Sequence, residues 1–312
     1  MNVFIDGNAG TTGLKLEERL RGRGDITLLK VDDALRKDQS AKKAVMDEAD
    51  VIFLCLPDDA ARESAAMAGA GAIVIDASTA HRADPGWVYG LPELSQQRRL
   101  AVSRATRIAV PGCHASGFIS MVYPLVSSGL LSAGARLNCV SLTGYSGGGR
   151  GLIDTYENGR TPGDMLCAPR PYALGLTHKH LPEMTAQTGL THEPHFYPVC
   201  GDMARGMLVS VHLWADQFAQ DTPPEKVWEA LAAHYSGSRF IRVMPLDGES
   251  PLDGGFLDPT ACNGTNDMEI FVFGNSKQML LAARLDNLGK GASGAAVQCM
   301  NIACGIEEHL GL

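Results

Sequence analysis

Short apolar runs alternate with helix-like segments along the first third of the chain. These runs cover residues 3–5, 26–31, 51–56, 72–75 and 108–110 and are rich in β-branched side chains. Apolar runs separated by helices are typical of parallel strands that are buried on both faces. The pattern predicts a βαβ series, and therefore an α/β domain built on a doubly wound parallel sheet of the Rossmann type.

The pattern changes after residue 112. Candidate strands at residues 138–142, 207–214, 240–244, 268–273 and 278–284 follow with fewer helices between them. Residues 207–214 partly alternate between apolar and polar, as expected for a sheet with one buried face. We therefore expect a second, α+β domain with a mixed or antiparallel sheet, followed by a loop and a helix within residues 287–312.

Composition narrows the class of protein. A chain of 312 residues is long for one hydrophobic core and comfortable for two domains. The formal net charge of −8 argues against nucleic acid as a partner, and no apolar run is long enough to predict a membrane span. The eight cysteines are scattered and form no Cys-x-x-Cys pair, so we expect free thiols and a cytoplasmic location.

Three glycines follow the first predicted strand directly. Gly7, Gly10 and Gly13 stand in a Gly-x-x-Gly-x-x-Gly spacing that also contains Thr11 and Thr12, and a helical pattern follows. Glycines at such a turn let the backbone approach a pyrophosphate, and the helix N-terminus offers free N–H groups. We interpret this segment as a dinucleotide-binding loop; the alternative is a tight strand-to-helix turn with no ligand.

The residues after the second predicted strand leave the choice of dinucleotide open. Asp32 and Asp33 lie where an acidic residue would bind the ribose 2′-hydroxyl of NAD. Arg36 and Lys37 follow shortly and would pair with the 2′-phosphate of NADP, or simply form a solvated helix face.

The segment around Cys113 carries the most information about chemistry. A buried strand ends at Val110, Pro111 and Gly112 make a turn, and an apolar-periodic helix follows. Cys113 therefore opens a helix at the carboxyl end of a sheet strand, where the helix dipole favours the thiolate. A buried structural thiol is the alternative, and the Pro-Gly turn before the helix favours the nucleophile instead.

A nucleophilic cysteine beside a nicotinamide cofactor indicates reduction of an activated acyl group. The thiolate attacks the acyl carbon, a thioester forms as the leaving group departs, and hydride from the cofactor reduces the thioester to an aldehyde. His178 and His180 are candidate acid/base residues. The alternative is a metal site formed with His192 or His195. His-x-His does not supply a complete set of metal ligands here, so we expect no metal.

A glycine run and three arginines are candidates for binding anionic groups of a substrate. Backbone N–H groups beside a guanidinium suit a carboxylate or a phosphate. A surface ion pair is the commoner use of a lone arginine. The candidates are Arg82, Ser146, Gly147, Gly148, Arg150 and Arg205.

Several short motifs occur in a fixed order along the chain. They are Phe4-Ile5-Asp6-Gly7, Cys55-Leu56-Pro57-Asp58-Asp59-Ala60, Asp76-Ala77-Ser78-Thr79-Ala80-His81-Arg82, Pro111-Gly112-Cys113, Ser146-Gly147-Gly148-Gly149-Arg150, His178-x-His180-x-Pro182-Glu183, Arg205-Gly206 and Asp286-Asn287-Leu288-Gly289-Lys290-Gly291-Ala292. Together with the N-terminal glycine loop, this set resembles the short form of the N-acetyl-γ-glutamyl-phosphate reductase family. The resemblance covers essentially the whole chain.

The resemblance implies a fold similar to that of aspartate-semialdehyde dehydrogenase, with NADP(H) as the cofactor. Residues 1–112 with 285–312 would form the NADP-binding Rossmann domain, and residues 113–284 the catalytic, substrate-binding and oligomerisation domain. It also implies reduction of N-acetyl-L-glutamyl 5-phosphate to N-acetyl-L-glutamate 5-semialdehyde and phosphate, through a thioester, in arginine biosynthesis. We expect a small-molecule substrate and a homodimer or homotetramer.

The matching motif positions imply individual roles. Cys113 matches the nucleophile and His180 the acid/base residue. Glu183 is expected among the substrate-binding residues. The cofactor-binding residues implied beyond the glycine loop are Arg36, Pro57, Ser78, Asn287 and Lys290, of which the last two lie in the segment beside the nicotinamide.

The sequence departs from the family pattern next to the nucleophile. The family has Asn-Pro-Gly-Cys-Tyr-Pro-Thr, whereas this chain has Val110 in place of the Asn, and His114, Ala115 and Ser116 in place of Tyr, Pro and Thr. The loss of the amide removes one hydrogen-bonding group near the thiol. The alternatives are a related acyl-phosphate reductase, such as one acting on aspartyl phosphate, and a non-catalytic NADPH-sensing Rossmann protein.

Overall fold

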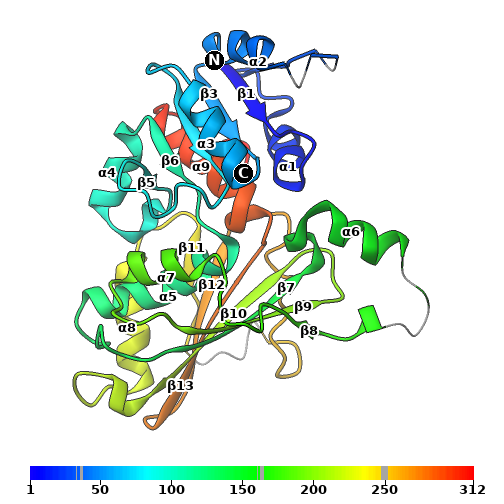
Figure 1. Cartoon of the computed structure of the whole chain (residues 1–312). Coiled ribbons are helices and arrows are strands. Elements are labelled where there is room, and N and C mark those ends of the chain that lie inside the picture. Colours follow the sequence, from blue (N-terminus) through cyan, green and yellow to red (C-terminus); the bar gives the residue numbers. More distant parts are fainter. Residues whose placement is uncertain (33, 36–37, 160, 162–164, 247–251) are drawn as a thin grey trace. The chain divides into compact units, whose positions relative to one another are not determined.

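The chain folds into two compact units, which are shown in a computed structural model (Figure 1). The structure describes all residues except 33, 36–37, 160, 162–164 and 247–251. The first unit comprises Met1–Gly112 and Ala292–Leu312, and the second comprises Cys113–Gly291. The chain returns to the first unit after Gly291 rather than after residue 284, because Asp286 and Asn287 still hydrogen-bond to residues of the second unit.

The first unit is built on a six-stranded sheet in which every pair of neighbours is parallel. The strand order is β2-β1-β3-β4-β6-β5, so the chain reverses its direction of winding between β1 and β3. This order confirms the predicted doubly wound sheet. The strands are β1 (Asn2–Asp6), β2 (Thr27–Leu29), β3 (Val51–Leu54), β4 (Ile73–Asp76), β5 (Val88–Tyr89) and β6 (Arg107–Ala109).

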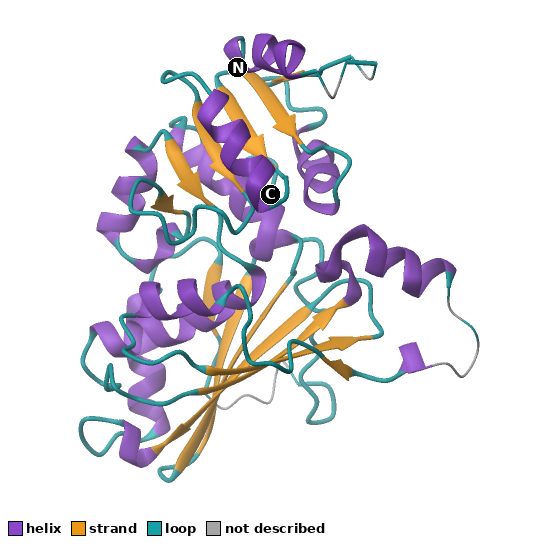
Figure 2. Cartoon of the chain, in the orientation of Figure 1, coloured by secondary structure: helices purple, strands orange, loops and turns teal. Residues whose placement is uncertain are grey.

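Helices cover both faces of this sheet (Figure 2). Val3 and Ile5 point to one face, where they join a core that includes Val297 and Met300, while Phe4 points to the other face and joins Met46. This alternation follows from the two-residue period of a strand. The helices are α1 (Thr11–Leu20), α2 (Gln39–Asp47), α3 (Asp58–Met67), α4 (Gln96–Arg104), α9 (Gly294–Ala303) and the short η1 (Pro92–Leu94).

The second unit is built on a seven-stranded mixed sheet with the order β11-β12-β13-β10-β7-β9-β8. Antiparallel pairs lie at its centre, whereas β7–β9 and β11–β12 are parallel. The expected mixed sheet is therefore confirmed. The strands are β7 (Asn138–Gly144), β8 (Arg170–Pro171), β9 (His195–Gly201), β10 (Met207–Trp214), β11 (Ile241–Val243), β12 (Met268–Gly274) and β13 (Gln278–Leu285).

Helix α5 (Cys113–Ser127) packs closely against the central strand β10. A β-carbon on Gly117 would lie 2.7 Å from Cγ2 of Val209, so only glycine permits this approach. The nucleophile's helix is thus fixed directly on the sheet. The other helical segments of this unit are α6 (Gly149–Asn158), α7 (Leu181–Thr188), α8 (Pro224–His234), and the short η2 (Tyr145–Gly148), η3 (Met165–Cys167) and η4 (Ala215–Gln217); a π-helical turn, η5 (Gly289–Ser293), follows β13.

Three strands, β5, β8 and β9, were not predicted from the sequence. Strand β9 contains Pro198, which cannot donate a hydrogen bond to a neighbouring strand and therefore argues against a strand inside a sheet. In the structure β9 pairs in parallel with β7 along its whole length, and β8 pairs with it near Val199 and Cys200. Strands β5 and β8 have only two residues each, too few for a pattern.

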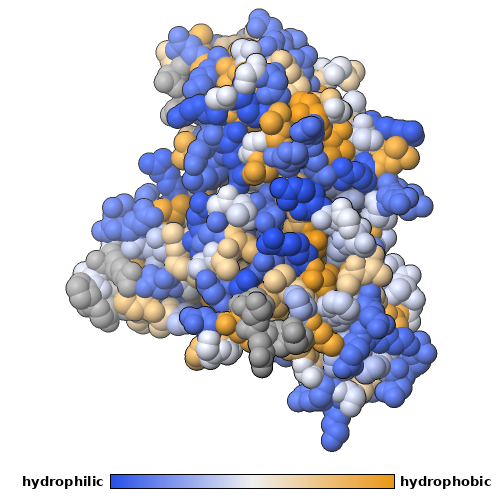
Figure 3. Space-filling model, turned by 180° about the vertical axis from the view of Figure 1, so that it is seen from behind, coloured by the Kyte–Doolittle hydropathy of each residue, from blue (hydrophilic) through white to orange (hydrophobic). Residues whose placement is uncertain are grey.

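The surface in Figure 3 is mainly hydrophilic, with smaller apolar patches between the polar residues. Within the part of the chain that the structure describes, no helix has both the length and the apolar character needed to cross a bilayer.

Candidate active site

Cys113 is the first residue of α5, as the sequence predicts. Cys113 is partly buried. The first N–H groups of an α-helix have no partner within the helix, and the aligned peptide dipoles place partial positive charge there. A thiolate at this position is therefore favoured over a thiolate elsewhere on the surface.

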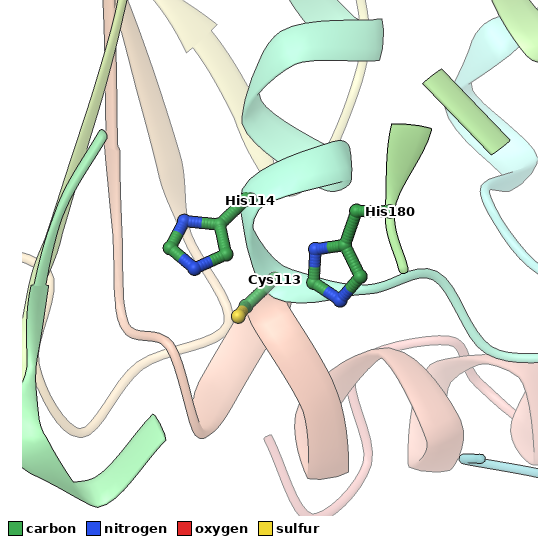
Figure 4. A group of neighbouring side chains, drawn as sticks. All are labelled: Cys113, His114 and His180. Atoms are coloured by element: carbon green, nitrogen blue, oxygen red, sulfur yellow. The ribbon is translucent and has the colours of Figure 1, made fainter. Parts of the chain in front are cut away.

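Two imidazoles flank the thiol. Figure 4 shows Cys113, His114 and His180 grouped together, and their ligating atoms lie within 4.8 Å of one another. His180 precedes α7 directly, and its backbone N–H donates to Nδ1 of His178 at 3.1 Å. The ring centroids of His178 and His180 are 4.6 Å apart. A base therefore stands within reach of the sulfur, as thiol chemistry requires.

The same three side chains are the set that a soft metal ion would use. Cys113, His114 and His180 offer one sulfur and two nitrogen donors, which is a ligand set typical of zinc. Both ring nitrogens of His114, however, already hydrogen-bond to Ser141 and Tyr172. The cluster is thus better suited to thiol chemistry than to a resident metal.

Glu183 lies in the first turn of α7, three residues after His180. Its Oε1 is 4.0 Å from Nε2 of His180, and the residue is only 2 % exposed. A buried carboxylate at this distance stabilises the protonated imidazole electrostatically. This position indicates an orienting role toward His180, whereas the sequence placed Glu183 among the groups that contact substrate.

A hydrogen-bond network joins three loops that are far apart in the sequence. Nδ2 of Asn287 donates to Oγ of Ser146 at 2.9 Å, and Oδ1 of Asn287 accepts from the N–H of Gly206 at 3.0 Å. The buried Asn287 therefore fixes both the glycine run and the Arg205-Gly206 segment. Two residues predicted to face ligands, Ser146 and Asn287, are bonded to each other.

The candidate cations of the second unit lie in different surroundings. Arg205 forms an ion pair with the buried Asp286, which also accepts from the N–H groups of Gly264 and Leu288. Lys290 is fully buried, with Nζ 5.7 Å from the ring centroid of Phe240. Three other residues of the predicted substrate site are exposed: Gly147 and Gly148 in η2, and Arg150 in the first turn of α6.

The glycine loop of the first unit has the geometry of a phosphate cradle. Gly7 has a φ of +89°, and a β-carbon there would lie 2.3 Å from the carbonyl oxygen of Cys55. A β-carbon on Gly13 would lie 2.4 Å from the carbonyl oxygen of Gly7. Gly10 is the N-cap residue of α1 and has no side chain to occupy the free N–H groups at Thr11 and Thr12. These residues fit a dinucleotide's pyrophosphate.

A pocket of about 440 Å³ opens beside this loop. Lys30 and Lys42 line it together with Gly7, and Lys42 also forms an ion pair with Asp6 at 2.9 Å. The size and the two cations suit a nucleotide. Arg36, Asp33 and Lys37 lie outside the described residues, while the Asp32 carboxylate accepts from the N–H of Ala34 at 2.9 Å.

The other predicted ligand residues of the first unit hold its own loops. Pro57 is the N-cap residue of α3. Ser78 donates its hydroxyl to Asp76 at 2.7 Å, and the Arg82 guanidinium donates to the carbonyl oxygens of Val110 and Ala77 at 2.9 and 3.2 Å. These bonds shape the carboxyl edge of the sheet, and the ligand contacts of Pro57, Ser78 and Arg82 stay predictions.

Comparison with known proteins places this geometry in a family. Residues 7–101 match the NAD binding domain model of semialdehyde dehydrogenases, and residues 113–287 match the dimerisation domain model of the same enzymes. The chain is 44% identical to N-acetyl-gamma-glutamyl-phosphate reductase 2 of Nostoc sp., with 99% of this chain and 98% of that one covered. The protein of the same name from Pseudomonas putida is also 44% identical, with 98% of each chain covered.

This chain belongs to the N-acetyl-γ-glutamyl-phosphate reductase family. Solved structures of more distant proteins share its fold. Aspartate semialdehyde dehydrogenase II from Vibrio cholerae superposes with a TM-score of 0.72 at 16% identity, over 97% of this chain and 98% of that one. The sequence-based resemblance and the two-domain fold are thereby confirmed.

Sequence reasoning noted His114 only as a departure from the reductase family pattern, and it missed Tyr172 and Ser141. His114 Nδ1 is 2.7 Å from Oγ of Ser141, and its Nε2 is 2.9 Å from the hydroxyl of Tyr172. Burial lowers the pKa of His114 to about 3. The one signal in the sequence was a histidine directly after the nucleophile, at a helix start.

Proposed function

We propose that this protein reduces N-acetyl-L-glutamyl 5-phosphate with NADPH, giving N-acetyl-L-glutamate 5-semialdehyde and phosphate, as a step of arginine biosynthesis. The observation that carries this proposal is the grouping of the Cys113 thiol, at a helix N-terminus, with the imidazole of His180. Relatives at 44% identity that carry this enzyme name support the choice of substrate.

The chain's own residues account for the covalent steps. His180 accepts the thiol proton, and the sulfur of Cys113 bonds to the acyl carbon as phosphate leaves, so that a thioester forms. NADPH, when bound, would supply the hydride that turns this thioester into the anion of a hemithioacetal. His180 then returns a proton as the carbon–sulfur bond breaks, which releases the aldehyde and restores the thiol. Glu183 stabilises His180 while it holds the proton.

The proposed cofactor site is the loop before α1. The free N–H groups at Thr11 and Thr12 would hold the pyrophosphate, and Gly7, Gly10 and Gly13 leave the room for it. Pro57, Ser78, Asn287, Lys290 and Arg36 complete the proposed set, on the basis of their motif positions.

The proposed substrate site lies around the second unit's glycine run. Ser146 and Arg205 are fixed near each other through Asn287 and Gly206, and Arg150 follows the run at the surface. A bidentate guanidinium suits either the carboxylate or the phosphate of this substrate. Gly147, Gly148 and Arg82 belong to the same proposed set.

We also propose a homodimer or homotetramer in the cytoplasm. The second unit coincides with a dimerisation domain model, and large apolar side chains of that unit are strongly exposed: Met165, Leu174 and Phe256. All eight cysteines are free, as a reducing compartment favours. Sedimentation of the purified protein would measure the assembly.

The experiment is an NADPH oxidation assay with a panel of acyl phosphates. Turnover of N-acetylglutamyl phosphate in preference to aspartyl phosphate supports the proposal, and the opposite preference would identify the related reductase. The variant Cys113→Ser should lose reduction and keep NADPH binding. A protein that binds NADPH and turns over neither substrate would be a sensor rather than an enzyme.

A further inference from the structure

A buried chain of hydrogen bonds runs from the centre of the second unit's sheet to the neighbourhood of Cys113. Ser141, on β7, and His114, on α5, are 0 % and 3 % exposed. The Oγ of Ser141 lies 2.7 Å from Nδ1 of His114, and Nε2 of His114 lies 2.9 Å from the hydroxyl of Tyr172. A strand, a helix and the loop after β8 thus meet in one line of polar groups.

The direction of this chain follows from its donors and acceptors. His114 is neutral at physiological pH because burial holds its pKa at about 3, so its ring carries one proton. Within the described residues, Nδ1 of His114 is the one hydrogen-bond partner of the Ser141 hydroxyl. The Ser141 hydroxyl is fully buried and cannot donate to water, whereas Tyr172 is 36 % exposed and can donate to solvent. Every donor is satisfied only when Ser141 donates to Nδ1, so we assign this tautomer. The ring proton therefore lies on Nε2 and is donated to the oxygen of Tyr172.

This arrangement leaves the phenol proton of Tyr172 available to another molecule. Its hydroxyl accepts from His114, which is its one hydrogen-bond partner among the described residues. Burial is the main cause that raises the pKa of Tyr172, so the phenol stays protonated. Tyr172 as a residue is 36 % exposed, which leaves it accessible from solvent while its hydroxyl points at buried His114.

The backbone after Tyr172 is strained. Ala173 and Leu176 have φ values of 52° and 56°, and the N–H of Leu176 donates to the carbonyl oxygen of Ala173 at 2.9 Å. Left-handed conformations are uncommon for residues other than glycine and persist where the surroundings impose them. The strained turn connects Tyr172 to His178, whose ring centroids lie 6.1 Å apart. The strained turn thus holds both side chains beside His114, with ring centroids 6.4 Å (Tyr172) and 5.5 Å (His178) from that of His114.

We propose that Tyr172 is a further catalytic residue, and that its hydroxyl donates a hydrogen bond to the acyl oxygen of the substrate when Cys113 attacks. As sulfur bonds to the acyl carbon, the carbonyl π pair moves onto oxygen, and the phenol stabilises that charge without giving up its proton. The pair returns when phosphate leaves. His114 and Ser141 are positioning residues that act through Tyr172. This inference rests on the proposed function.

The test compares Tyr172→Phe with the control Tyr197→Phe, which alters an exposed tyrosine on β9 of the same unit. We expect Tyr172→Phe to lower kcat by about 10- to 100-fold and to change KM by less than about twofold, since a hydrogen bond made only in the transition state is lost. Alkylation of Cys113 by iodoacetamide should proceed at the wild-type rate, because the phenol acts on the acyl oxygen and not on the thiol.

Variants of the positioning residue provide the second arm. His114→Leu should show the same kcat loss as Tyr172→Phe, and His114→Gln, which keeps an N–H donor, should recover part of it. A wild-type kcat in Tyr172→Phe, or an alkylation rate that falls in parallel with kcat, would overturn the inference. If the wild-type protein itself does not reduce the acyl phosphate, the proposed function fails first and takes this inference with it.

Discussion

A β-carbon on Gly291 would lie 2.7 Å from the Cβ of Cys113 and 3.2 Å from its Cα. The first of these distances is shorter than carbon atoms tolerate, so one of the two residues would have to move. The position of the reactive sulfur is therefore fixed from two sides, by the start of α5 and by the backbone at Gly291.

The variant Gly291→Ala tests this packing. We expect kcat to fall by at least about tenfold, because small displacements of a reacting group are costly to catalysis. The control is Gly71→Ala, where an added β-carbon meets nothing within 4 Å. Equal activity of Gly291→Ala and Gly71→Ala would show that the residues around Cys113 can shift to accommodate the added carbon without loss of catalysis.

Iodoacetamide should alkylate Cys113 faster than the buried cysteines Cys139 and Cys262. Burial raises the pKa of Cys139, and burial is also the main cause that raises the pKa of Cys262 to about 12, so both should resist iodoacetamide near neutral pH. Cys113 should be alkylated, and the acyl phosphate should protect it. Mass spectrometry of peptides gives the extent of labelling at each position. The exposed Cys167 is the internal control, because substrate should leave its labelling unchanged.

Variants of His180 and Glu183 should distinguish the catalytic role of His180 from the orienting role of Glu183. His180→Asn should lower kcat by about 10² to 10⁴, the usual range for loss of a general acid/base. Glu183→Gln removes the charge 4.0 Å from the imidazole and should lower kcat by roughly tenfold with little change in KM. The exposed carboxylate of Glu193 is the control, as Glu193→Gln. A Glu183→Gln variant that raises KM and keeps kcat would instead support the original prediction of substrate contact.

The buried His114 should make stability depend on pH. Its pKa is lowered from 6.5 to about 3, so both folded and unfolded states are neutral above pH 6.5 and the full stability is present there. Below that pH the unfolded chain binds a proton that the folded protein rejects, and stability falls. The loss should be about 2 kcal/mol between pH ~7.5 and pH ~5.

Denaturant unfolding of wild type and His114→Gln at these two pH values measures the effect. The variant lacks the titrating group, so its stability should decline less than that of the wild type by the stated amount. Parallel declines in the two proteins would mean that His114 is protonated in the folded state.

A substitution in the glycine loop should weaken NADPH binding and leave the reactivity of Cys113 unchanged. Gly13→Ala places a carbon 2.4 Å from the carbonyl oxygen of Gly7 and should distort the N-terminus of α1. We expect NADPH affinity to fall at least about tenfold, in line with the loss of one or more charge-assisted hydrogen bonds. Fluorescence titration with NADPH measures this, and Cys113 alkylation should stay normal. Unchanged affinity would remove the loop from the proposed cofactor site.

Much of the fold follows from local pattern. Strand β10 was predicted at its observed bounds, Met207–Trp214, because its apolar and polar residues partly alternate, and in the structure its burial alternates along most of the strand. The start of α5 at Cys113 was predicted because Pro111 and Gly112 end one element immediately before another begins. Strand β9 was missed because Pro198 interrupts the signal, and only pairing with β7 shows that the residue belongs to a sheet.

Active-site residues were predictable from the sequence only where a single continuous segment contains the motif that identifies them. Cys113 and His180 stand in such segments. Ser141, His114 and Tyr172 come from three elements and become partners through packing of the second unit, which no local spacing encodes. The burial of Glu183 behind His180 was hidden for the same reason.

The chain's last helix completes the core that its first strand begins, since Val297 and Met300 of α9 pack with Val3 and Ile5 of β1. During synthesis, β1 leaves the ribosome before the second unit and α9 leaves it after the second unit. Until α9 is made, this face of the sheet is covered only in part, by Leu16 and Leu20 of α1 and Val102 of α4, and the nascent unit stays open to chaperones and to mispairing. A premature stop before Gly294 would leave Cys113, His114 and His180 in the product and still remove one of the helices that cover this face of the first unit's sheet.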